Sequence, residues 1–176
     1  MKQDQLVIQK IEAAFPQAIQ GTDDHRGEQT LILDGKQLQN VCQFLHDDPD
    51  LQYTFISDIV ADDYLNDPSA APDAPRFVVN YHLYSLSTTH RLRLRVLVAD
   101  ADKGPDTIGK VWKVGTWLEM EVWDLMGIVF AGNGSLRRLF MPEDWQGHPL
   151  RKDYPLGYEE VQFSFNWKEI EDRKLH

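Results

Sequence analysis

The sequence predicts an α+β protein: a mixed or antiparallel sheet flanked by helices, followed by an extended carboxy-terminal arm. Three observations point to this class. Apolar residues recur at helical spacing in the first fifty residues, two central segments alternate apolar and polar residues as half-buried strands do, and proline and glycine become frequent after residue 141. Because 176 residues correspond to one domain, we expect an α+β domain over residues 1–142 and a tail over residues 143–176 that wraps a partner.

The first element is expected to be a helix. Val7, Ile11 and Phe15 recur on one side of it, which is the pattern of an amphipathic helix packed on a core. Asp4 is suited to cap the start of this helix, and Pro16 is suited to end it.

Two short strands and a second helix are expected next. The strands lie near Ala18–Gln20 and Thr30–Leu33, and the polar residues from Gly21 to Gly27 form the turn between them. Asp34 then caps the helix. The buried side of this helix carries Leu38, Val41, Cys42 and Leu45. Cys42 is therefore interpreted as a small core residue.

Three further strands are expected between residues 53 and 98, with a surface loop over residues 66–75. The first is Tyr53 to Asp58. The second, Phe77 to Leu83, has an apolar face made of Phe77, Val79, Tyr81 and Leu83. The third, Arg91 to Val98, alternates Leu92, Leu94, Val96 and Val98 with Arg91, Arg93 and Arg95. Such alternation indicates a sheet buried on one face, while its other face meets solvent or a partner.

Composition and charge exclude several classes of function. Residues 1–75 contain 14 acidic and 4 basic residues, whereas residues 76–176 contain 14 of each. An acidic body repels phosphate backbones, so nucleic acid is not expected as a partner. The longest run of apolar residues and glycine, Leu125 to Gly132, has eight residues, whereas a membrane helix needs about 20. Membrane attachment is therefore expected only through partners.

No cofactor or metal site is expected in this chain. Cys42 is the only cysteine, which excludes an internal disulfide and a cysteine-ligated cluster and suits a reducing compartment. The six histidines lack zinc-site spacing. Gly127, Gly132 and Gly134 lack the spacing of a dinucleotide-binding loop, and no serine lies in a nucleophile elbow.

The densest group of polar residues lies on an expected third helix, which Asp106 or Thr107 would cap. Glu119, Glu121 and Asp124 are interleaved there with two tryptophans. We expect these carboxylates to accept hydrogen bonds from the basic residues downstream, namely Arg137, Arg138, Arg151 and Lys152. The alternative is a general acid/base pair, because crowded carboxylates raise one another's pKa.

The tail contains too many helix breakers for a packed element. Within sixteen residues it has Pro142, Gly147, Pro149, Pro155 and Gly157. Apolar and polar residues then alternate over residues 161–167, which predicts a strand. This strand either folds back on the domain's own sheet or adds to the surface of a neighbouring subunit. Because it follows a basic, breaker-rich stretch, we expect the neighbour.

Three motifs give the chain a resemblance to a known family. They are EMEVWDLMGI over residues 119–128, LRRL over residues 136–139 and GHPLRKDYPL over residues 147–156. Together they are similar to the C subunit of respiratory complex I, which is the thirty-kilodalton subunit in mitochondria and the J subunit in cyanobacteria and chloroplasts. The similarity covers about residues 53–158, and the third motif is the most specific.

Four positions depart from the pattern of that family. Met120 replaces an arginine, Trp123 a tyrosine or phenylalanine, Met126 a phenylalanine, and Asn133–Gly134 a His-Pro pair. Without the arginine, the neighbouring glutamates are expected to depend more on the downstream arginines, Arg137, Arg138 and Arg151. Asn133–Gly134 is expected to form a tight turn with positive φ.

The resemblance implies a non-catalytic subunit in the peripheral arm of NADH:quinone oxidoreductase. It would lie on the cytosolic side of the inner (cell) membrane, or on the stromal side of the thylakoid in the plastoquinone branch. It would scaffold the quinone-binding module beside a hydrogenase-like large subunit (D type) and a cluster-bearing small subunit (B type), during electron transfer from NADH to quinone coupled to proton translocation. FMN, iron–sulfur clusters, NADH and quinone would bind to partner subunits.

The resemblance also implies that the motif residues meet other subunits. The residues expected at these interfaces are Glu119, Glu121, Asp124, Arg137, Arg138, His148, Arg151, Lys152 and Asp153. Two alternatives stay open. One is the equivalent subunit of a membrane-bound hydrogenase or of a complex fed by ferredoxin or a deazaflavin. The other is a free-standing acid/base enzyme that uses the three carboxylates of the third helix.

Overall fold

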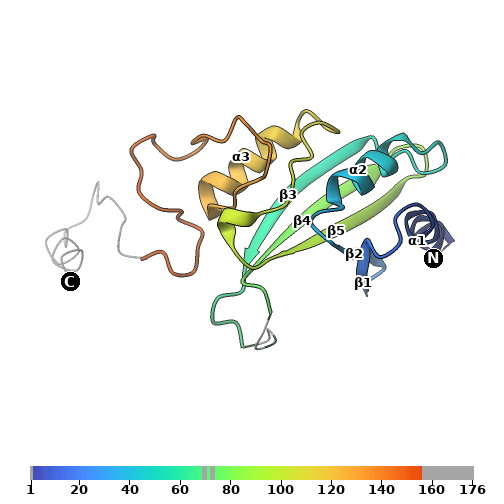
Figure 1. The fold of residues 1–176 in the computed structure, drawn as a ribbon, viewed down its shortest axis with the longest axis horizontal. Helices are drawn as coiled ribbons and strands as arrows, with labels where there is room; N and C mark the ends of the chain where they lie inside the picture. Colours follow the sequence, from blue (N-terminus) through green and yellow to red (C-terminus); the bar gives the residue numbers. More distant parts are fainter. Residues whose placement is uncertain (1, 69–70, 72–73, 156–176) are drawn as a thin grey trace, which may run out of the picture.

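The strands pair into one five-stranded sheet, and the helices pack against it (Figure 1). The computed structural model describes residues 2–68, 71 and 74–155. The strands are β1 (Ile19–His25), β2 (Glu28–Leu33), β3 (Phe55–Asp63), β4 (Phe77–Ser85) and β5 (His90–Val98). The helices are α1 (Lys2–Ala14), α2 (Leu38–Asp47), α3 (Gly115–Met126) and a short 3₁₀ helix, η1 (Ala101–Lys103). In these described residues, no helix has the length and apolar character that crossing a membrane requires.

The sheet is mixed, with the strand order β1-β2-β5-β4-β3. Strands β2 and β5 are parallel, and every other neighbouring pair is antiparallel. Parallel neighbours need a long connection, and here α2, β3 and β4 lie between them in the chain. The expected α+β class, with helices flanking a mixed sheet, is confirmed. Strand β3 begins and ends further along the chain than the expected Tyr53–Asp58.

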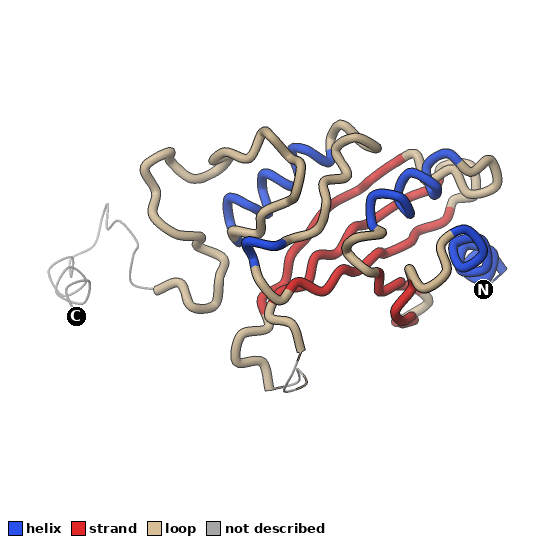
Figure 2. Tube along the Cα trace, viewed as in Figure 1, coloured by secondary structure: helices blue, strands red, loops and turns tan. Residues whose placement is uncertain are grey.

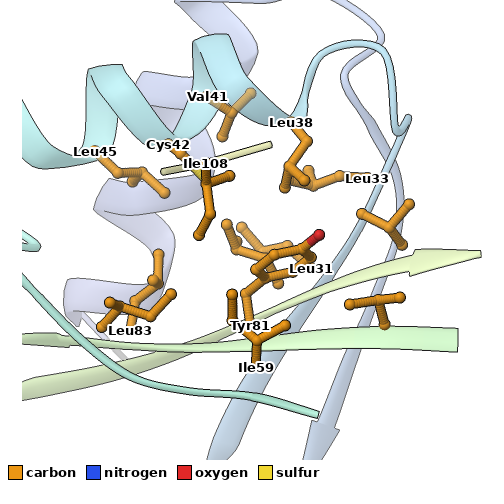
Figure 3. Packing of buried hydrophobic residues seen from close by; sticks show 14 of the residues in the cluster. Leu31, Leu33, Leu38, Val41, Cys42, Leu45, Ile59, Tyr81, Leu83 and Ile108 are labelled. Atoms are coloured by element: carbon orange, nitrogen blue, oxygen red, sulfur yellow. The ribbon is translucent and has the colours of Figure 1, made fainter. Parts of the chain in front are cut away.

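One face of the sheet carries the hydrophobic core. Figures 1 and 2 show α2 and α3 across this face, with α1 near the β1–β2 edge. The stripe expected on α2 is buried as predicted, because Leu38, Val41, Cys42 and Leu45 are all fully buried. They pack with Ile108 and with inward side chains of the strands (Figure 3). Each large apolar side chain contributes roughly 1.5–3 kcal/mol when buried, so this contact holds α2 on the sheet.

The opposite face of the sheet carries the arginines of β5. All three helices contribute side chains to the core on the first face, so the arginine face stays open. There, Arg93 forms an ion pair with Glu28 at 2.8 Å, and Arg95 donates to the side-chain oxygen of Asn80 at 3.0 Å. The expected division of β5 into a buried and an open face is confirmed.

The first hairpin differs from the expectation. Residues 21–25 belong to β1 instead of a long polar turn, and only Arg26 and Gly27 connect β1 to β2. Both residues have positive φ, 57° and 80°, as a two-residue type I′ hairpin requires. Polar residues are tolerated in β1 because it is an edge strand with mostly exposed side chains.

The caps expected for the first two helices are wrong. Asp4 lies inside α1, where its carboxylate is 2.9 Å from Nε2 of His90. Asp34 accepts a hydrogen bond from the backbone N–H of Lys36 at 3.1 Å, and α2 follows Gln37 without a side-chain cap. Aspartate forms local turns as readily as it caps helices, so its presence alone does not locate a helix start.

We predict that Cys42 is unreactive in the folded protein. Burial, with a smaller effect of the Glu119 charge, raises the pKa of its thiol far above the ordinary range, so the reactive thiolate is scarce. The disulfide reagent DTNB is expected to modify Cys42 rapidly in concentrated guanidinium chloride and very slowly in buffer. A second thiol introduced by Leu86→Cys, at a position 67% exposed, is the positive control. Equal rates in buffer for the two thiols would contradict the buried position of Cys42.

Candidate functional site

Helix α3 and the segment after it contain most of the residues that the sequence motifs single out. The helix begins at Gly115, and its cap residue Val114 makes no side-chain hydrogen bond. Asp106 and Thr107, which were expected as caps, lie in the preceding loop instead. The helix ends at Gly127, whose φ of 73° is the left-handed conformation that favours glycine at this position.

Asp124 is the centre of the site. Its side chain is fully buried, and Oδ1 accepts a hydrogen bond from Nη1 of Arg138 at 2.9 Å. Oδ2 accepts from the backbone N–H groups of Leu139, Phe140 and Met141, at 2.9, 2.7 and 3.0 Å. Successive backbone N–H groups can form an anion-binding concavity, and here Asp124 supplies the anion. The expected pairing of Asp124 with a downstream arginine is therefore confirmed for Arg138.

The donors around Asp124 keep it ionised. Burial by itself would raise the pKa of this carboxyl group. The N–H of Met141, the guanidinium of Arg138 and the N–H groups of Leu139 and Phe140 together outweigh burial and lower the pKa below its ordinary value. The site therefore holds a buried negative charge at neutral pH, which the guanidinium compensates.

Arg138 closes the loop that follows α3. Its Nη1 donates to the backbone carbonyl of Asp124 at 2.9 Å as well as to the carboxylate. Its Nη2 donates to the backbone carbonyls of Trp145 and Gly147 at 2.8 and 2.9 Å. The guanidinium also lies 5.5 Å from the ring centre of Trp123 on α3. The Arg138 side chain thus connects the segment of residues 138–147 to α3: Arg138 begins this segment and also binds the carbonyls near its other end.

Arg151 and His148 cover the carboxy-terminal end of α3. Arg151 donates from Nε to the carbonyl of Met126 at 2.6 Å, and His148 donates from Nδ1 to the carbonyl of Asp124 at 2.9 Å. A positive charge is favourable at this end of a helix, where carbonyls lack partners within the helix. Burial and the nearby Arg151 lower the pKa of His148, although its bond to the carbonyl acts the other way. A Cβ atom at Gly127 would lie 2.4 Å from both Arg151 and His148, so glycine also makes room for them.

A second ion-pair group links the tail to the sheet. Arg76 donates to both carboxylate oxygens of Asp63, at 3.0 and 2.8 Å, and to Asp153 at 2.8 Å. The backbone N–H of Lys152 donates to Asp63 at 3.0 Å. Burial would raise the pKa of Asp63, but Arg76 and the N–H groups of Lys152 and Leu65 lower it to about 2. Asp63 and Arg76 were not expected as site residues, because nothing in the local sequence pairs them with a segment 77 to 89 residues away.

Glu119 has a different environment from the one expected. It is fully buried and accepts hydrogen bonds from Oγ1 of Thr107 at 2.6 Å, from the N–H of Ile108 at 2.7 Å and from Nδ2 of Asn133 at 2.8 Å. Burial raises the pKa of Glu119 in spite of these bonds. The expectation that Glu119 pairs with a downstream arginine is therefore wrong for the described residues. Asn133, at a position that departs from the family pattern, supplies a donor instead.

The remaining predicted contacts of α3 are also not formed. Glu121 is half-buried and makes no hydrogen bond or ion pair with a described residue. The guanidinium of Arg137 lies 5.9 Å from the ring centre of Trp117, and Nζ of Lys152 is 3.8 Å from Asp67.

The turn after α3 also differs from the expectation. The positive φ expected in the Asn133–Gly134 pair is found instead at Gly132, with a value of 83°.

The described part of the predicted tail lies against the domain. Residues 143–155 reach the end of α3 through Arg138, His148 and Arg151, and they reach β3 through Asp63. The ring of Trp145 stacks on Tyr154 with ring centres 6.4 Å apart. The strand predicted over residues 161–167 lies outside the described residues, so its pairing and the boundary at residue 143 stay predictions.

The site has the geometry of a structural junction. Glu119 and Asp124 are buried against different loops, and each carboxylate accepts at least three hydrogen bonds from the chain itself. Glu121 is half-buried and forms no hydrogen bond with either of them. This arrangement favours holding loops in place over acid/base chemistry by a pair of carboxylates. Among the residues that the structure describes, no group of three or more His, Cys, Asp or Glu side chains could hold a metal ion.

Comparisons with known sequences agree over most of the chain. A family described as respiratory-chain NADH dehydrogenase, 30 Kd subunit, matches residues 31–160. The C subunit of NADH-quinone oxidoreductase from Roseiflexus castenholzii is 40% identical over 164 residues, which cover 93% of this chain and 91% of that protein. The protein of the same name from Geobacter sulfurreducens is 42% identical over 156 residues, which cover 89% of this chain and 92% of that protein.

Two solved structures have a similar fold. A trypsin-resistant fragment of Nqo5 superimposes with a TM-score of 0.60 at 29% identity, covering 76% of this chain and 98% of the fragment. A chain from the membrane-bound sulfane sulfur reductase, an archaeal respiratory membrane complex, superimposes with a TM-score of 0.68 over 88% of this chain and 86% of that one. Its identity is 17%, so this second similarity concerns the fold alone.

We predict that Asp124→Asn loosens the loop after α3. The amide keeps the shape of the side chain but removes the charge that balances Arg138, and it directs an NH₂ group at backbone donors. Breaking a buried ion pair in this way costs about 3–5 kcal/mol. Urea unfolding of the isolated chain measures the loss, and hydrogen exchange at residues 139–141 locates it. Asp153→Asn is the matched control, because that side chain is 49% exposed and a surface pair is worth about 0–1 kcal/mol. Equal effects of the two variants would contradict a central role for Asp124.

The Asp63–Arg76 pair predicts a pH dependence of stability with a definite sign. Because the folded pKa of Asp63 is about 2 and the unfolded value is about 3.9, the charged form stabilises the fold. This contribution is complete above about pH 4 and is lost as the pH falls towards the folded pKa. The difference in unfolding free energy between wild type and Asp63→Asn should therefore shrink by on the order of 2 kcal/mol from pH 7 to pH 2. A difference that stays constant over this range would contradict the assignment.

Proposed function

The chain belongs to the family of the 30 kDa subunit of respiratory-chain NADH dehydrogenase, and we propose that it holds the quinone-binding module of that complex in place without a reaction centre of its own. In this role it is a peripheral-arm subunit of NADH-quinone oxidoreductase. Its similarity to the C subunits of two bacterial enzymes of that name extends over about nine tenths of both chains, which supports the same place in the complex.

The observation that carries the proposal is the exposed outer side of α3. Apolar residues point in every direction around this helix, and a helix that is apolar on all sides is normally buried. The sheet covers only one side of α3, so Trp117 is 52% exposed and Leu125 is half-buried. Among the nine exposed large apolar side chains of the described residues, five belong to residues 114–150: Val114, Trp117, Leu139, Phe140 and Leu150. A partner that covers this side would complete the burial.

The motif residues divide into two roles in this proposal. Asp124, Arg138, His148 and Arg151 shape the surface from within, because their polar atoms bond to the chain itself. Glu121 and Arg137 contact partners directly, because the structure gives neither an ion-pair partner among the described residues. Lys152 and Asp153 contact partners where the tail leaves the sheet. Glu119 acts indirectly by holding the loop before α3 against the loop after it.

The partners that we propose are the hydrogenase-like large subunit and the cluster-bearing small subunit. These chains would carry the quinone site and the terminal iron–sulfur cluster, and other subunits would bind FMN and NADH. The single cysteine of this chain is buried in its core, where it is not available to a cluster. This supports the division of labour between a scaffold and cofactor-bearing chains.

The tail beyond residue 143 is proposed to extend this contact along a partner. Its described part is tied to α3 and β3, where the Asp63–Arg76–Asp153 group fixes the position of residues 152–153. Attachment to the cytoplasmic face of the membrane, or to the stromal face of the thylakoid in a plastoquinone enzyme, would then come through the partner subunits.

A second candidate stays open beside the NADH-quinone enzyme, because a chain of an archaeal respiratory membrane complex has a similar fold. In that case the chain would be the equivalent subunit of a membrane-bound hydrogenase or of a complex fed by ferredoxin or a deazaflavin. The sequence similarity to the C subunits of NADH-quinone oxidoreductases favours the NADH-quinone branch.

Purification from native membranes tests the proposed function. Complexes captured from a mild-detergent extract through a tag on this chain are expected to contain the large subunit and the cluster-bearing small subunit. They are also expected to contain iron and flavin and to show NADH:quinone activity. Oxidation of reduced ferredoxin instead of NADH would favour the second candidate. Recovery of the chain alone, from extracts in which the complex is intact and active, would overturn both. The isolated chain is expected to show no flavin or iron absorption.

A further inference from the structure

A hollow opens beside the outer side of α3. It has a volume of about 400 Å³ and is lined by Trp117, Met120, Leu136, Arg137 and residues 134–135. The side chain of Met120 is buried, with 2% exposure, whereas Trp117 and Arg137 are exposed. Met120 therefore gives the hollow a buried apolar residue, while Thr116, Ser135 and Arg137 add polar groups to its lining.

Trp117 and Arg137 form one wall of this hollow together. The guanidinium lies 5.9 Å from the ring centre, which is within the range of a cation–π contact. Such a contact holds the arginine side chain beside the ring. Tryptophan and arginine are also the residue types most enriched among side chains that dominate binding at protein interfaces.

Arg137 differs from the arginines deeper in the site in lacking a counter-charge. Arg138 pairs with Asp124 at 2.9 Å and Arg76 pairs with Asp63 at 2.8 Å, but no described carboxylate forms an ion pair with Arg137. Among the described residues, the Arg137 guanidinium interacts only with the ring of Trp117, so no described carboxylate competes for it. Guanidinium groups bind carboxylates with two parallel hydrogen bonds.

We propose that this hollow receives an apolar side chain of a partner polypeptide while Arg137 binds a carboxylate of the same segment. The inference rests on the proposed function, because it needs a partner subunit, and it adds the place and the chemistry of the contact. The segment that fits presents a large aliphatic or aromatic residue next to Asp or Glu. Trp117 and Met120 bury the apolar group, and Arg137 selects the acidic neighbour.

The open face of the sheet is the competing surface. A hollow of about 550 Å³ lies there, lined by Phe55, Tyr84, Arg91 and Arg93 among others. Of its two arginines, Arg93 already has a carboxylate partner, because it is 2.8 Å from Glu28. This face belongs to a sheet with its core on the other side, so its exposure is ordinary. It therefore supplies matched controls for substitutions near α3.

Competition during assembly tests the proposal. Wild-type and variant chains with distinguishable peptides are co-expressed in cells that lack the chromosomal copy, the complex is purified, and mass spectrometry gives the ratio of incorporated chains. Trp117→Ala and Arg137→Glu are each expected to lower incorporation by about 30-fold, the effect of removing a dominant interface residue. Arg137→Lys keeps the charge without the planar fork and is expected to fall between wild type and Arg137→Glu.

A third variant fills the hollow without removing any side chain. A Cβ atom at Gly134 would meet nothing within 4 Å, so Gly134→Trp is expected to fold normally and to block docking. Gly134→Ala is its small control. Leu86→Ala and Arg91→Glu, at exposed positions away from α3, control for loss of an apolar group and for charge reversal. These three controls are expected to incorporate at the wild-type level.

The outcomes separate the two hypotheses. If wild type assembles and the three disruptive variants incorporate as well as it does, the docking site is wrong and the proposed function stands. If wild type itself is absent from every complex, the proposed function fails. Thermal unfolding of each isolated chain shows whether a variant is folded. If Trp117→Ala is unfolded, Arg137→Glu and Gly134→Trp decide the result.

Discussion

The buried charge of Asp124 is the constraint on which the rest of this site depends. A carboxylate with no exposure to water must be neutralised and hydrogen-bonded within the protein. Asp124 meets this requirement because its carboxylate accepts hydrogen bonds from three successive backbone N–H groups and from the guanidinium of Arg138. The chain from residue 138 to residue 141 is thereby turned towards α3. Phe140, 62% exposed, is held at the surface by the hydrogen bond that its backbone N–H donates to Oδ2 of Asp124, rather than by burial of its ring.

The same logic extends from α3 to the sheet. Arg151 satisfies the last carbonyl groups of the helix and lies 5.5 Å from the ring centre of Phe77 on β4. Arg76, beside Phe77, holds Asp63 at the end of β3 and Asp153 in the tail. Because each guanidinium bonds to groups from separate segments, the helix end, the sheet edge and the tail form one junction.

The sequence predicted the elements far better than it predicted the contacts between them. The stripe on α2 and the alternation in β4 and β5 follow from periodicity within one segment, and both are found. Asp34 and Thr107 misled the assignment of helix starts because cap residues also bond within loops. Glu119 was assigned to arginines from charge alone, yet its partners include Asn133, whose approach depends on the path of a loop. Asp63 and Arg76 gave no local signal at all, since their role appears only when residue 152 is brought to β3.

In this site the buried carboxylates Asp124 and Asp63 have ion-pair partners, whereas the exposed Arg137 has none among the described residues. This difference indicates that folding precedes docking. The deep carboxylates, Asp124 and Asp63, obtain their counter-charges from the chain itself, so the junction forms without help from another subunit. The shallow groups, Trp117 and Arg137, contact each other, but neither is fully buried and neither meets a carboxylate among the residues that the structure describes. Folding of the isolated chain therefore builds the surface first, with its shape already set. Docking then costs little conformational entropy, because a preorganised surface binds without first having to become ordered.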